Sequence, residues 1–223
     1  MTTAELQTEV GTRFARLGLP SWPDPHPDRS PREDEYSRVT DPARYGVVHA
    51  RGRVWAQVLA DLTAARVEEL PAAVPDAAGR VGYDRAVRVV PPRVEGLPLL
   101  LLERDVRDAA YEAPLAVLEI AVARPEVVVE RWPDCGCDAC DTGSADLLDA
   151  VDRTIVAVVG GPFVVLQAHR WQASWHPDGG SCGGEPPVPD FHEMMGICRR
   201  LADGRPVEVP LGAEAFVGQS WLG

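Results

Sequence analysis

The chain of 223 residues is long enough for one large domain, and its 45% hydrophobic and 25% charged residues are ordinary globular values. Its formal net charge of −12, with arginine as the only cationic side chain besides histidine, opposes binding to nucleic-acid backbones and anionic membranes. Residues 1–19 lack the pattern of a signal peptide, and no apolar run approaches the ~20 residues of a membrane span. We therefore expect a soluble, cytoplasmic protein with no nucleic-acid or membrane partner.

The first 40 residues are predicted to be a helix followed by an extended segment. Apolar side chains recur at helical spacing over residues 4–18. Prolines then crowd residues 20–35, and because each fixes φ and removes a donor, this stretch should be irregular. It is either a mobile linker or is held on the domain surface by Trp22 and Tyr36. We expect residues 1–40 to form this N-terminal part and residues 41–223 a single domain.

That domain is predicted to begin with a helix. Asp41 followed by Pro42 is typical of a helix start, and the apolar spacing extends the helix to about Glu69. Strands are then predicted from alternating apolar residues, with a hairpin turn at residues 124–126. These strands cover residues 83–90, 97–103, 115–123 and 127–132.

The C-terminal half is predicted to alternate between helices and strands. A helix with Ser144 as its N-cap ends at Gly160, and a long strand follows over residues 163–175. A loop rich in glycine and proline over residues 177–189 precedes a helix at residues 190–201 and a short strand in the tail. Together these elements predict an α+β fold, with a mostly antiparallel sheet packed against several helices.

Three cysteines within six residues, Cys135, Cys137 and Cys140, are the most chemically distinctive feature of the sequence. Zinc is usually held by cysteines or histidines at this loop spacing. Asp134, Asp138 and Asp141 crowd the same loop, and negative neighbours make thiolates costly unless a cation is bound. The pattern therefore predicts a Zn²⁺ site.

A tetrahedral site needs a fourth ligand from elsewhere in the chain. Cys182 is the first candidate because it lies among glycines that would let the backbone fold closely around an ion. His176, in the same region, is the second. Cys198 falls in the apolar stripe of the last predicted helix and is better explained as a small buried hydrophobic residue.

Three interpretations of the cysteine loop remain open at this point: a structural metal site, a redox couple, and a loop without function. The first makes the protein an accessory or binding protein with a zinc-stabilised loop. The alternative is a metal-dependent or thiol-based enzyme, with His169, Glu193 or an acid of the cysteine loop as proton carrier. A protein partner is a third option, supported by the acidity and the six tryptophans.

Several segments resemble an uncharacterised bacterial family from GC-rich genomes. The first is Glu35-Tyr-Ser-Arg-Val-Thr-Asp-Pro42 with Arg44-Tyr45, and the second is the loop from Cys135 to Asp141 with the following Gly-Ser-x-x-Leu-Leu. The third is the closing Phe216-Val-Gly-Gln-Ser-Trp-Leu222. The resemblance implies a domain of unknown function and carries no activity, substrate or cofactor.

Overall fold

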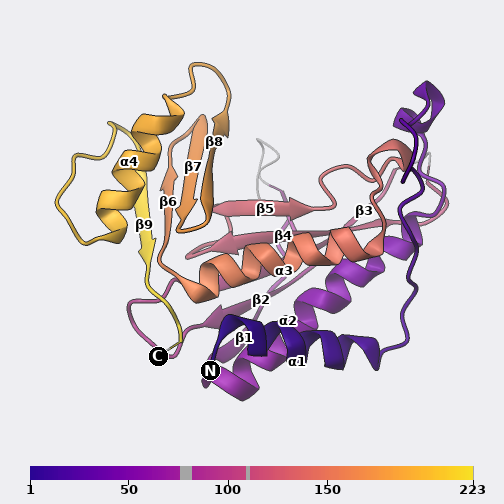
Figure 1. The fold of residues 1–223 in the computed structure, drawn as a ribbon, viewed down its shortest axis with the longest axis horizontal. Helices are drawn as coiled ribbons and strands as arrows, with labels where there is room; N and C mark the ends of the chain where they lie inside the picture. The colour runs from indigo at the N-terminus through magenta and orange to yellow at the C-terminus, as the bar shows by residue number, and fades with distance from the viewer. Residues whose placement is uncertain (76–81, 109–110, 223) are drawn as a thin grey trace.

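The computed structural model describes residues 1–75, 82–108 and 111–222, and it confirms the predicted α+β fold with antiparallel sheets. Two sheets are present in the described part, one of five strands and one of four (Figure 1). Within the same residues, no helix has both the length and the apolar character that crossing a membrane would need.

The first sheet is an antiparallel meander in which each strand pairs with the next along the chain. Five residues of β1 pair with five residues of β2. The turn between β4 and β5 confirms the predicted hairpin at residues 124–126. Its strands are β1 (Arg66–Leu70), β2 (Arg85–Val90), β3 (Leu99–Val106), β4 (Leu115–Val122) and β5 (Val128–Trp132).

Three helices supply apolar side chains to the core over one face of this sheet: α1 (Thr3–Ala15), α2 (Val47–Thr63) and α3 (Ser144–Gly160) (Figure 1). Since side chains alternate along a strand, Leu99 and Leu101 join the core beneath the helices, whereas Leu100 and Leu102 join a smaller cluster. All eight residues of β4 are buried, including Glu119, which pairs with Arg131.

The second sheet has the strand order β8-β7-β6-β9 and is covered by α4 (Phe191–Ala202). The central strand β6 is buried on both faces: Phe163 and Val165 belong to the main core, and Val164 and Leu166 pack with α4. Its strands are β6 (Phe163–Gln167), β7 (Trp171–His176), β8 (Gly179–Gly184) and β9 (Glu214–Gly218).

Two predictions about this second sheet are wrong. The single strand expected over residues 163–175 is a hairpin of β6 and β7, in which Val164 lies opposite Trp175. The loop expected over residues 177–189 contains β8, which pairs with β7 along six residues. Backbone hydrogen bonds hold β8, and its four glycines leave no apolar alternation from which a strand could be predicted.

The predicted helix from residue 41 to residue 69 is also corrected. The chain forms a short 3-10 helix, η2 (Pro42–Gly46), and then α2, which ends at Thr63 because Ala64 adopts a left-handed conformation with φ of 60°. The remaining residues of the prediction become β1. Their pairing with β2, about twenty residues away, outweighs the local helical spacing.

Candidate metal centre

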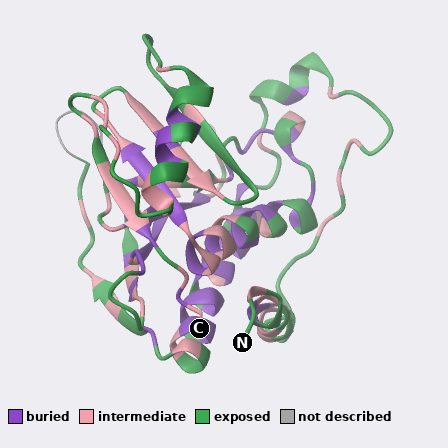
Figure 2. Ribbon diagram, turned by 60° about the vertical axis from the view of Figure 1, so that its left-hand side comes forward, coloured by how far each residue is buried: buried purple, intermediate pink, exposed green. Residues whose placement is uncertain are grey.

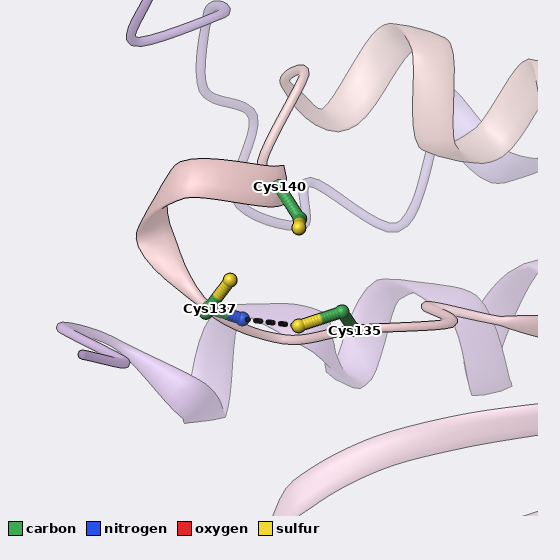
Figure 3. A group of neighbouring side chains, drawn as sticks. All are labelled: Cys135, Cys137 and Cys140. Atoms are coloured by element: carbon green, nitrogen blue, oxygen red, sulfur yellow. Dashed lines mark hydrogen bonds between the residues drawn. The ribbon is translucent and has the colours of Figure 1, made fainter. Parts of the chain in front are cut away.

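The three clustered cysteines lie in the loop that leads from β5 into α3, and a short 3-10 helix, η3 (Asp138–Cys140), bends this loop. Their sulfur atoms all lie within 4.8 Å of one another (Figure 3). Thiolates on a tetrahedral zinc ion, with Zn–S bonds of ~2.3 Å, are separated by ~3.8 Å. The spacing therefore fits a metal ion, although the set has three ligands rather than four.

The loop is held in its bend by the strand beneath it. A Cβ atom on Gly136 would lie 2.5 Å from a terminal side-chain carbon of Leu115, so a side chain at this position would require Leu115 to move. Cys137 is buried, whereas Cys135 and Cys140 are exposed. One side of the cluster is thus packed against the protein and the other side is open.

The thiols interact with one another. The backbone N–H of Cys137 donates a hydrogen bond to Sγ of Cys135 at 3.4 Å (Figure 3). Burial raises the pKa of Cys137, but hydrogen bonds from Cys135 and Cys140 outweigh it, so that the pKa lies below its usual value. Hydrogen bonding to Cys137, together with burial and the charge of Cys135, raises the pKa of Cys140 to about 12. A second thiolate is therefore costly unless a cation is bound.

Each of the two buried acids of the loop, Asp138 and Asp141, is paired with an arginine from the N-terminal part of the chain. The Asp138 carboxylate accepts hydrogen bonds from Arg38 at 2.6 Å and from the backbone and hydroxyl of Thr40. Asp141 accepts from Arg44 at 2.5 Å and from the indole N–H of Trp22 at 3.0 Å. The sequence pattern did not reveal these partners.

The extended N-terminal segment is thereby fastened to the start of α3. Gly143 has a φ of 89°, and a Cβ atom there would lie 2.6 Å from the backbone nitrogen of Asp24. Gly143, and not Ser144 as predicted, is the N-cap of α3, because the Ser144 hydroxyl instead hydrogen-bonds the backbone of Trp22 at 3.1 Å. Of the two alternatives left open by the sequence, the segment is held on the domain, and Trp22 holds it, whereas Tyr36 is exposed. Figure 2 shows the exposed course of the residues between α1 and this anchor.

Glu35 is the charged centre of the same segment, within η1 (Glu33–Ser37). Its buried carboxylate accepts two hydrogen bonds from Arg29 at 2.9 Å and one from the Arg32 backbone N–H at 2.6 Å. Hydrogen bonding from Arg29, followed by that from Arg32, holds the pKa of Glu35 well below its usual range.

This lowered pKa predicts that acid loosens the N-terminal segment. The stabilisation is complete above the unfolded-state pKa of ~4.3 and is lost as the pH falls below it towards the folded-state value. Hydrogen exchange of a peptide covering residues 33–45 should rise in that range, and Glu35→Gln should raise it at pH 7. Glu33→Gln, two residues earlier and exposed, is the control. Equal exchange in both variants would contradict the role of Glu35.

The two residues predicted as a fourth ligand lie on the second sheet. Cys182 is in β8, with Sγ 3.8 Å from the Pro189 carbonyl oxygen, and His176 ends β7 with its ring stacked on Phe163. Neither belongs to the group of ligand atoms within 4.8 Å. Their role as ligands stays a prediction. Cys198 is fully buried in the core under α4, as expected, and burial raises its pKa to about 11.

An open cavity of about 460 Å³ adjoins the cysteine cluster and is lined in part by Cys135 and Cys140. Neither His169 nor Glu193 lines it. His169 lies in the exposed turn after β6, and Glu193 lies on the exposed side of α4. His169 and Glu193 are thus not joined to the cysteines by this cavity, whereas Asp134, one of the acids of the loop, lines it.

Fold and site together define an α+β protein with a three-thiol loop suited to a metal ion. A model described as a family of unknown function (DUF6226) matches residues 10–222, and the chain belongs to that family. This confirms the predicted resemblance to an uncharacterised family, while the bacterial, GC-rich origin stays a prediction. The comparisons with curated proteins and with solved structures found no match.

Two of the three segments on which that resemblance was based are in contact in the fold. Arg38, Thr40 and Arg44 of the first segment bind Asp138 and Asp141 of the second. Sequence reasoning singled out both segments but did not connect them. The charges offered the only signal, since arginines in one segment complement carboxylates in the other.

Proposed function

We propose that Cys135, Cys137 and Cys140 bind one zinc ion, and that the protein is an accessory or binding protein whose zinc-held loop fastens its N-terminal segment. The observation that carries this proposal is the convergence of three sulfur atoms within 4.8 Å. Soft thiolates favour zinc among the common divalent ions. The ion would join the end of β5 to the start of α3, beside the carboxylates that bind Arg38 and Arg44.

Elemental analysis tests this directly. Protein purified at neutral pH without chelators should contain about one zinc ion per chain. Less than about a tenth of an equivalent of any transition metal, together with no uptake of added zinc, would rule the proposal out.

Removal of zinc should loosen the loop without unfolding the protein. The main core is formed by side chains of α1, α2, α3, the first sheet and β6, and it does not include the cysteine cluster. Treatment with a chelator should therefore raise hydrogen exchange in residues 133–143 and in the residues that contact them, while the exchange of β3 and β4 stays unchanged. Global unfolding on chelation would show that the ion organises the whole fold.

The open cavity beside Cys135 and Cys140 favours a second candidate, a metal-dependent or thiol-based enzyme. Since His169 and Glu193 do not line the cavity, such an enzyme would carry protons on an acid that does, such as Asp134 of the loop, as predicted, or Asp146 of α3. Redox chemistry would need Cys137 as the thiolate, because its pKa is the one that is lowered.

For partners, we propose a protein and neither nucleic acid nor membrane, in the cytoplasm where thiols stay reduced. The net charge of −12 supports this choice. Many arginines are also already paired with acids, as in Arg124 with Glu214. Capture from a matched cell extract, compared with binding to DNA and to anionic vesicles at 0.15 M salt, tests this choice. Binding to DNA or to vesicles would contradict it.

A further inference from the structure

Two residues that line the cavity beside the cysteine cluster each carry a buried polar atom, the Tyr45 hydroxyl and the Trp132 indole nitrogen. Neither atom has a well-formed hydrogen bond among the described residues. Arg44 lies beside the Tyr45 hydroxyl, but a guanidinium can only donate, so it provides no acceptor for the hydroxyl proton. Both side chains line the cavity together with Cys135 and Cys140. A buried polar group left without a partner costs ~1–3 kcal/mol, so a ligand that hydrogen-bonds these two groups would be favoured here.

The ring of Tyr45 is firmly positioned for this role. It is only 2% exposed, lies edge-on to Trp22 at a centroid distance of 5.7 Å, and has the Arg44 guanidinium 5.3 Å from its own centroid. Trp132 is fixed by its pairing with Leu118 at the end of β5. These two groups are held on rigid elements, which is the arrangement of a preformed small-molecule site.

The cysteines present an open side to the same space, since Cys135 and Cys140 are exposed while Cys137 is buried. Zinc sites with a closed set of four protein ligands are structural, whereas sites with three protein ligands keep a fourth position for water or a substrate. In the described residues, three ligand atoms converge and a cavity lies against two of them.

We propose that the ion held by these cysteines has an exchangeable fourth position that opens into the cavity and takes a neutral ligand, which is water in the resting protein. This inference rests on the proposed zinc site. The ligand would donate one lone pair to the ion and exchange hydrogen bonds with Trp132 and Tyr45. The other polar side chains that line the cavity belong to the cysteine loop and to α3.

Charge decides that the ligand is neutral. A divalent ion with three thiolates carries a net charge of −1, and the exposed carboxylates of Asp134 and Asp146 also line the cavity. The one arginine in the lining, Arg153, is already paired with Asp149. An anion would therefore meet net repulsion, whereas water, imidazole or a carbonyl compound would not.

Cobalt substitution of the full-length protein separates this inference from the proposed zinc site. Charge-transfer absorption from thiolate to Co(II) reports metal binding, and the visible bands report the fourth ligand. Imidazole is expected to shift the visible bands at millimolar concentration, and azide to need at least about tenfold more. Tyr45→Phe should weaken imidazole binding by about 3- to 10-fold, the value of one hydrogen bond, without changing cobalt affinity. Tyr83→Phe, in the separate cluster on the other face of the first sheet, is the matched control.

Each result has one meaning. Cobalt binding without any response to imidazole overturns the exchangeable position and leaves the zinc proposal intact. A response that appears only in Cys182→Ala or His176→Ala also overturns it, and assigns that residue as the fourth ligand. Azide binding as well as imidazole contradicts the preference for neutral ligands. Absence of the charge-transfer band means that both proposals fail.

Discussion

Replacing Cys137 by serine is expected to lower zinc affinity by about 100-fold. Structural zinc binds small peptides with ~10–16 kcal/mol, so loss of one ligand in four removes roughly 3 kcal/mol. Cys137 is the buried member of the cluster, and its backbone N–H also hydrogen-bonds Sγ of Cys135. Competition with a chromophoric chelator at pH 7 measures the change.

The matched control for this variant is Cys198→Ala, which removes a cysteine from the core under α4 and leaves the cluster intact. It should keep wild-type zinc affinity even if it lowers stability. Equal zinc affinity in Cys137→Ser and the wild type would show that the cluster does not bind the ion. Affinity should also fall as the pH is lowered, because bound thiolates must lose their protons.

Asp152→Ala is expected to reduce the free energy of unfolding by about 3–5 kcal/mol, the usual effect of removing one partner of a buried ion pair. The Asp152 carboxylate on α3 accepts two hydrogen bonds from the Arg51 guanidinium on α2, one of them at 2.8 Å. It also accepts one from the Trp55 indole N–H at 2.7 Å. The variant leaves a cation and an indole N–H without a partner among buried residues.

Asp149→Ala, one turn earlier on the same helix, provides the comparison. Asp149 also pairs with an arginine, Arg153, but their side chains are 61% and 65% exposed. An exposed pair of this kind contributes ~0–1 kcal/mol, so Asp149→Ala should change stability little. Denaturant unfolding of both variants gives the difference. Similar losses would mean that burial does not set the strength of the Asp152 pair.

Much of the first sheet could be predicted from sequence because its strands carry their own signal. Leu118, Ile120 and Val122 alternate with Glu119 on β4, and the structure places them on opposite faces as expected. The second sheet could not be predicted in the same way. The hairpin of β6 and β7 and the glycine strand β8 depend on backbone pairing, which leaves little trace in side-chain pattern.

In the candidate site, too, local features could be predicted from the sequence, whereas contacts between distant residues could not. The proximity of the three cysteines follows from their spacing within one loop, so the cluster could be predicted locally. The partners of Asp138 and Asp141 lie about 100 residues earlier in the chain, and no local pattern connects them. The location of Cys182 likewise depends on how the second sheet is placed, which could not be deduced from its glycine neighbours.

The double-faced burial of β6 has a consequence for how the molecule comes apart. Successive side chains of β6 alternate between the main core under the helices of the first sheet and the smaller core under α4. Dissociation of α4 from its sheet would expose Val164 and Leu166. Displacement of β6 itself would also remove Phe163 and Val165 from the main core. Together with Phe216 of β9 and Trp221 of the tail, which also pack on the main core, β6 therefore couples the unfolding of the second sheet to that of the first.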